Sequence, residues 1–244
     1  MENLNCVEET KSILRNCIKP KLKDEGFKKN GNTFYRKSSE LIHVCNVQFG
    51  RSNTRDYAYF TYNIKISMPS LFNKFDIHKD KEIDCAIFDY RLGDIMGMVN
   101  NTFLVDHWYE VGYFSPDLDY EKQLASSALN NGKDVQQAQA RGKYINSLKN
   151  RYNHRNIEEV KGIIVRDFDD IVLPFFNKIQ NVDDLAELII SKSIKIGMAQ
   201  PFLLTYFLEK GEIDKGLEVI NGMDSDYLKE KTSKYLSNKG IHIQ

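Results

Sequence analysis

Histidines are the first residues to test for metal chemistry in this chain. They are His43, His78, His107, His154 and His242. None has a second ligand three or four residues away on an expected helix, the spacing at which a helix presents paired ligands. His78 is flanked by Asp76 and Asp80, but a catalytic metal centre needs about three well-placed protein ligands. We therefore predict no metal site and no cofactor.

Other catalytic signatures are also missing. The stretch from Gly93 to Gly97 lacks the lysine and the glycine spacing of a phosphate-binding loop, and no Gly-x-Ser-x-Gly elbow occurs. The cysteines, which we expect to be reduced and mostly buried, are Cys6, Cys17, Cys45 and Cys85. A triad assembled in space stays open, because triads are defined by geometry. The sequence leaves enzymatic activity undecided and favours a protein without it.

Cations and tyrosines are expected to gather along one edge of a predicted sheet. They are Lys28, Lys29, Arg36, Lys37, Arg51, Arg55, Tyr35, Tyr57 and Tyr59. Aromatic rings beside cations can stack the bases of single-stranded nucleic acid. The same pattern also suits an ordinary charged edge that discourages pairing with other strands. The formal net charge of zero argues against a basic nucleic-acid binder of the usual kind.

Four side chains are the candidate binding residues: Arg36, Asn63, Arg91 and Trp108. Arg36, Asn63 and Arg91 would serve a nucleotide or nucleic acid held by polar side chains of the sheet. Arg91 and Trp108 would serve a third possibility, a small-molecule pocket between the sheet and the helices. We assign no catalytic residue.

The strands that would carry these residues follow from alternation. Between Ala58 and Met68 every second side chain is apolar, and those between them are mostly polar. This is the pattern of an antiparallel strand with one buried face. Strands are expected at 32–37, 41–49, 57–67, 85–91 and 104–112. His43 falls on the apolar face, where we expect a buried, hydrogen-bonded side chain rather than a ligand.

Helices are expected on both sides of this sheet segment in the sequence. Residues 3–24 should form a helix that covers the buried face, with a kink or short break at 18–21 because Pro20 lacks a backbone donor. Residues 69–84 should form a long packed loop. The later helices are expected at 117–129, 134–152, 156–179, 183–191, 199–209, 212–220 and 225–238. The stretch 206–217 indicates a packed helical hairpin and gives no sign of a groove.

These elements predict an α+β fold: an N-terminal helix on an antiparallel sheet of about five strands, followed by an all-helical C-terminal half. The expected boundary lies at the Ser115-Pro116-Asp117 step, which divides an α+β sheet domain at 1–115 from a helical region at 116–244. The two halves can share one core.

Several stretches match a known pattern. They are Gly26–Arg36 (GFKKNGNTFYR), Leu41–Gln48, Phe60–Ile64, Arg91–Gly93, Trp108–Tyr109 and Leu173–Phe176. Together they resemble the bacterial family called domain of unknown function 4304, most clearly over residues 14–67. The resemblance implies a fold and carries no activity, substrate or catalytic residue. Tyr62 departs from the family pattern, where a smaller aliphatic residue is expected, and this affects packing more than function.

The leading functional hypothesis is a non-catalytic, cytosolic protein-interaction module, of which an immunity or antitoxin partner is one specific form. The alternative is a protein or enzyme that binds nucleic acid or a nucleotide through the basic and aromatic sheet edge. No apolar run is long enough to span a bilayer, and Met1–Glu9 lacks the pattern of a secretory signal. We therefore expect a cytoplasmic protein without a membrane partner.

Overall fold

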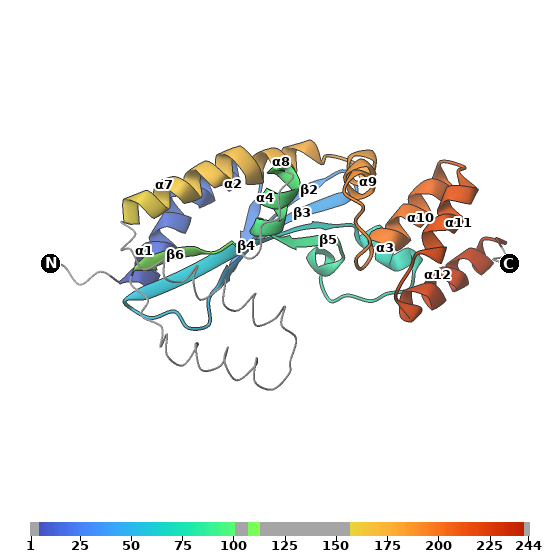
Figure 1. The fold of residues 1–244 in the computed structure, drawn as a ribbon, viewed down its shortest axis with the longest axis horizontal. Coiled ribbons are helices and arrows are strands. Elements are labelled where there is room, and N and C mark those ends of the chain that lie inside the picture. Colours follow the sequence, from blue (N-terminus) through green and yellow to red (C-terminus); the bar gives the residue numbers. More distant parts are fainter. Residues whose placement is uncertain (1–4, 101–106, 113–156, 242–244) are drawn as a thin grey trace, which may run out of the picture.

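A single antiparallel sheet organises the fold. The computed structural model describes residues 5–100, 107–112 and 157–241 (Figure 1). The strands are β1 Lys28–Asn30, β2 Thr33–Ser38, β3 Leu41–Phe49, β4 Tyr57–Ser67, β5 Ala86–Arg91 and β6 Tyr109–Gly112. They run in the order β1-β2-β3-β4-β5, and β6 also pairs with β4. The four strands expected at 32–37, 41–49, 57–67 and 85–91 are confirmed, and β1 was not foreseen.

Strand β4 is the centre of this sheet because it pairs with three neighbours. Along one side it meets β3. Along the other, its first residues pair with β6 and its last residues with β5. The apolar face predicted for 57–67 is confirmed, since Phe60, Ile64 and Ile66 are all fully buried. The fifth expected strand is present as β6, while residues 104–106 lie outside the described ranges.

The first helix covers this apolar face, as expected, but Pro20 does not break it. Helix α1 (Cys6–Ile13) continues through a π-helical turn, η1 (Leu14–Ile18), into α2 (Lys19–Asp24). The backbone N–H of Lys19 donates to the carbonyl of Leu14, five residues back. The wider π turn accommodates a proline, which has no N–H to donate and whose ring would crowd the preceding turn of an α-helix.

A second helix has the same construction. Helix α7 (Ile157–Asp167) continues through a π turn, η3 (Phe168–Val172), into α8 (Leu173–Lys178), and Pro174 is the second residue of α8. This element confirms the helix expected at 156–179. The two π-containing helices lie on the same face of the sheet (Figure 1), and Lys21 of α2 pairs with Asp169 of η3 at 2.8 Å.

The segment 69–84, expected to be a loop, is partly helical. It contains α3 (Pro69–Lys74) and a 3-10 turn, η2 (Glu82–Asp84). Pro69 suits the first turn of a helix, where its missing N–H would have no partner. Phe72 and Phe75 are buried, so the segment belongs to the core. Helix α4 (Leu92–Asn100) follows β5 directly.

Four further helices form what we call the C-terminal lobe, residues 182–238. They are α9 Val182–Ser191, α10 Ala199–Glu209, α11 Ile213–Asn221 and α12 Asp226–Asn238, and they match the helices expected there. The lobe lies beside α3 at one end of the sheet (Figure 1). Lys74 pairs with Glu209, and the rings of Phe75 and Tyr235 lie 4.9 Å apart.

The hydrophobic core is continuous across the two parts of the chain. Val160, Phe168 and Phe176 belong to the same buried cluster as the sheet residues. A smaller cluster inside the lobe contains Leu204, Ile220 and Leu236. The predicted boundary near 115 and the helices expected at 117–129 and 134–152 lie outside the described residues, so these stay predictions.

Two neighbouring tyrosines in this core differ in whether their hydroxyl groups are hydrogen-bonded. Both Tyr62 and Tyr109 are buried, and the hydroxyl of Tyr109 donates to Oδ2 of Asp167 at 3.0 Å. The hydroxyl of Tyr62 has no hydrogen-bond partner within the described part of the chain. A buried hydroxyl without a partner destabilises the folded state, because its hydrogen bonds to water are lost on folding.

The Tyr62→Phe variant should therefore unfold with a free energy about 1 kcal/mol higher than the parent, whereas Tyr109→Phe should lose about 1 to 3 kcal/mol because Asp167 loses its donor. Urea unfolding of the two variants measures both values. Equal destabilisation of the two would mean that the Tyr62 hydroxyl has a bonding partner after all.

Candidate functional site

Arg36 lies at an edge of the sheet's buried face and joins three elements. Its Nε donates to Nδ1 of His43 at 3.0 Å. One terminal nitrogen donates to the Glu25 carbonyl and carboxylate, at 3.1 and 3.2 Å. The other donates to the carbonyl of Phe176 and to Oδ1 of Asn177, at 3.1 and 2.7 Å. All five N–H groups of a guanidinium are thereby in use, and they tie the end of α2 to β3 and α8.

His43 is the fully buried partner of this arginine, as its place on the apolar face predicted. Its ring stacks on Phe176 with centroids 5.5 Å apart. Burial and the adjacent Arg36 charge lower the pKa of His43 to about 4, and a backbone interaction with Ile179 acts weakly in the opposite direction. Nε2 has no hydrogen-bond partner among the described residues. Neutral His43 therefore accepts from Arg36 through Nδ1.

The other three candidate residues lie on the opposite face of the sheet. Asn63 and Arg91 are paired across β4 and β5, and the Arg91 guanidinium lies 5.5 Å from the centre of the Trp108 ring. The amide of Asn63 donates to Gln48 Oε1 at 3.0 Å. The sheet thus brings Asn63, Arg91 and Trp108 together and separates them from Arg36.

Two cations of the basic edge expected for nucleic acid are paired with the protein's own carboxylates. Arg36 pairs with Glu25 at 3.2 Å and Lys37 pairs with Glu82 at 2.7 Å. Lys28 on β1 stays exposed. These two ion pairs reduce the positive charge that the edge can offer to a phosphate backbone.

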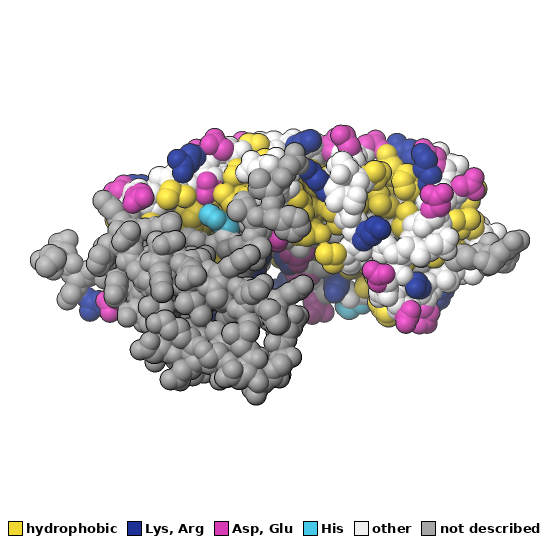
Figure 2. Space-filling view, viewed as in Figure 1, with side chains coloured by type: hydrophobic (Ala, Val, Ile, Leu, Met, Phe, Trp, Pro, Cys, Tyr) yellow, Lys and Arg dark blue, Asp and Glu magenta, His cyan; other side chains and the backbone are white. Residues whose placement is uncertain are grey.

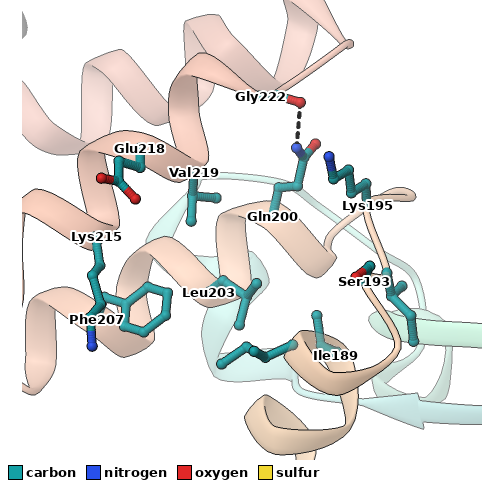
Figure 3. A pocket seen from close by; sticks show the side chains of 12 residues that line it. Ile189, Ser193, Lys195, Gln200, Leu203, Phe207, Lys215, Glu218, Val219 and Gly222 are labelled. Carbon is teal, nitrogen blue, oxygen red and sulfur yellow. Dashed lines mark hydrogen bonds between the residues drawn. The ribbon is translucent and has the colours of Figure 1, made fainter.

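A groove of about 340 Å³ lies elsewhere, in the C-terminal lobe (Figure 3). Its floor is α10, which contributes Gln200, Leu203 and Phe207. One wall is the end of α9 with the loop that follows it, and the other wall is α11. The helical hairpin predicted for residues 206–217 is present, since α10 and α11 pack together. The hollow forms between this hairpin and α9, and Phe207 and Lys215 of the hairpin line it.

Sequence reasoning missed this groove, although α10 contains a signal for it. Its sequence AQPFLLTYFLE has apolar residues on every side, as in a helix that is covered all round. In the structure Phe202 and Leu204 are buried, whereas Leu203 and Phe207 are only half-buried. The sequence therefore shows that α10 needs packing partners on every side. It does not show that the side with Leu203 and Phe207 lacks one.

One histidine and one carboxylate lie close together beside the core tyrosines. His107 Nε2 lies 3.6 Å from Asp167 Oδ2, the oxygen that accepts from Tyr109. The Thr61 hydroxyl donates to the backbone carbonyl of His107 at 2.7 Å rather than to its imidazole, so this hydroxyl is not activated by the His107–Asp167 pair. Within residues 5–100, 107–112 and 157–241, no three His, Cys, Asp or Glu side chains are grouped closely enough to hold a metal ion.

Comparison with known proteins identifies the family. The model of a family described as a domain of unknown function, DUF4304, matches residues 18–178. The chain belongs to DUF4304. Neither the curated proteins nor the solved structures contain a significant match. The DUF4304 match ends with the last residue of α8, so the C-terminal lobe and its groove lie beyond it.

The Arg36 cluster of the DUF4304 part should be a structural clamp. Arg36→Met should lower the free energy of unfolding by about 2 to 4 kcal/mol, because Glu25 and His43 lose a buried donor. Arg36→Lys should recover only part of this, since an ammonium cannot reproduce the planar fork. Lys37→Met is the matched control: its side chain is 63% exposed and should change stability by less than about 0.5 kcal/mol. Urea unfolding that places Arg36→Met level with the control would contradict the clamp.

The lowered pKa of His43 predicts a pH dependence of stability. Below the unfolded-state pKa of about 6.5, the His43 imidazole of the unfolded chain binds a proton. In the folded chain the same imidazole stays neutral until the pH approaches 4. Stability should therefore fall as the pH drops from 7 to 5, by about 2 kcal/mol for this group. In His43→Gln this loss should be reduced. His78→Gln, altered at an exposed side chain, should follow the parent, and an unchanged slope in His43→Gln would refute the assignment.

Proposed function

We propose that this chain is a cytosolic, non-catalytic protein-interaction module that binds its partner through the C-terminal lobe. The main support for this proposal is the location of the large exposed hydrophobic side chains. Among the described residues they are Val99 on α4 and, in the lobe, Ile190, Ile196, Ile213 and Tyr227. Figure 2 shows apolar side chains breaking the surface over α10 and α11. A contiguous exposed apolar surface marks a binding site, and Ile190 lines one such surface together with the half-buried Leu203 and Phe207.

The lobe is held firmly enough to serve as a binding platform. Besides the pair Lys74–Glu209, Lys231 of α12 donates to the carbonyl of Asp76 at 2.9 Å. The connection between α8 and α9 is short, and Ser38 of β2 donates to the carbonyl of Gln180 within it at 2.8 Å. A surface held in one arrangement loses little conformational entropy on binding.

The proposed location is supported by two further observations. None of the helices in the described ranges is long and apolar enough to cross a bilayer. All four cysteines are free thiols, as is usual in a reducing compartment. An immunity or antitoxin partner is one specific form of the module, and the rigid platform with an apolar surface is compatible with it.

Binding of nucleic acid or a nucleotide stays the alternative. It has less support from the geometry, because Arg36 has no free donor and Lys37 is paired with Glu82. A pocket around Trp108 and Arg91 likewise stays a prediction.

Photo-crosslinking in cells distinguishes these functions. A crosslinking amino acid at Ile196, whose side chain is 71% exposed in the lobe, should give a discrete protein adduct. The same amino acid at Lys28, exposed on β1, is the control and should give none. A nuclease-sensitive adduct at Lys28 with no protein adduct at Ile196 would overturn the proposal in favour of the nucleic-acid alternative, and the absence of any adduct would also contradict it.

A further inference from the structure

The floor of the groove is a stripe along one face of α10. Gln200, Leu203 and Phe207 follow one another at helical spacings of three and four residues. Seven residues of helix span about 10 Å, or two turns. Leu203 and Phe207 are half-buried, and Ile190 on the facing wall is 49% exposed. The chain therefore leaves an apolar channel of two helical turns without cover from its described residues.

The walls indicate what shape of partner fits. The α11 wall presents Lys215, Glu218 and Val219 from one helical face, and the opposite wall is the end of α9 with the loop that follows it. The floor and the α11 wall are helices, whose backbone N–H and C=O groups are already used internally. No strand lies among residues 182–241, so an extended peptide would find no sheet edge to pair with, and binding here depends on side chains entering the channel. That is how an amphipathic helix binds in a groove.

The charges at the two ends of the channel are unequal. Lys195 lies at the Gln200 end, and Lys215 lies beside Phe207 at the other end (Figure 3). Lys215 is already paired with Glu212 at 2.5 Å. Lys195 has no ion pair in the part of the chain that the structure describes, and the N-terminus of α10 opens at the same end. Both place positive potential there, which favours an acidic side chain.

We propose that the groove receives an amphipathic helix of another protein. Its apolar side chains, spaced by three and four residues, enter the channel over Leu203 and Phe207. An acidic residue at one end of the helix pairs with Lys195. This inference rests on the proposed function and adds to it the class of partner and the orientation in which it binds.

Peptide display tests this without knowledge of the natural partner. A library of random 14-residue peptides is selected against the full chain. We expect enrichment of sequences with apolar residues at helical spacing and Asp or Glu near one end. Ile190→Asp should weaken binding of the enriched peptides by at least about 20-fold, because it places a charge in an apolar contact. Lys195→Glu should weaken it by about three- to tenfold, and a peptide with Lys at its acidic position should restore it.

The control variant is Val99→Asp. Val99 is as exposed as Ile190, at 49%, but it lies on α4 outside the lobe and does not line the groove, so peptide binding should be unchanged. Both sites are exposed enough for the fold to tolerate Asp, and thermal unfolding of both variants checks this. Equal loss in the two variants would overturn the proposal, as would enrichment of extended or basic peptides, or none.

The crosslinking and peptide-display experiments distinguish failure of the proposed partner class from failure of the proposed function. A protein adduct at Ile196 together with no helical peptide selection would remove the helix and leave the interaction module in place. If the adduct is a second copy of this chain, or if only a small apolar molecule fills the groove, the proposed partner is wrong. Failure of both experiments would remove the function itself.

Discussion

The structure depends on one buried cation. A guanidinium taken out of water destabilises a protein unless its donors are all bonded and its charge is balanced. Arg36 meets this condition only when the end of α2 brings Glu25, the sheet brings His43 and the end of α8 brings Phe176 and Asn177. The arginine therefore fixes where the two covering helices end relative to the sheet.

The two helices that cover the sheet each accommodate a proline in the same way. Each must cross the sheet in one piece, and each contains a proline in its middle. A π turn directly before Lys19-Pro20 and again before Leu173-Pro174 lets both helices continue. Each π turn contains one residue more than an α-helical turn. This extra residue rotates the side chains that follow it around the helix axis. The proline signal in the sequence was real, but its outcome was a change of helical pitch and not a break.

Much of the fold could be predicted from local patterns, and the functional surface could not. The alternation of residues 57–67 determined the central strand, because burial of one face imposes a period of two. Arg36 was interpreted as a surface cation since its partners at 176 and 177 are about 140 positions away along the chain. Its neighbour Phe34, two residues earlier on the same face of β2, was the available hint. The groove depends on how α9 packs beside α10, which no single segment encodes.

The place where the family match stops has a consequence for ancestry. The match ends at α8, and the connection at 179–181 leads directly into the C-terminal lobe. The Arg36 cluster is complete without any residue of α9–α12. The main core, however, includes lobe residues such as Leu185, Ile189 and Phe202. A chain with another segment after α8 would keep the Arg36 cluster but would need new apolar cover for that end of the core. Kinship over the first part of such chains would then be a poor guide to what each one recognises.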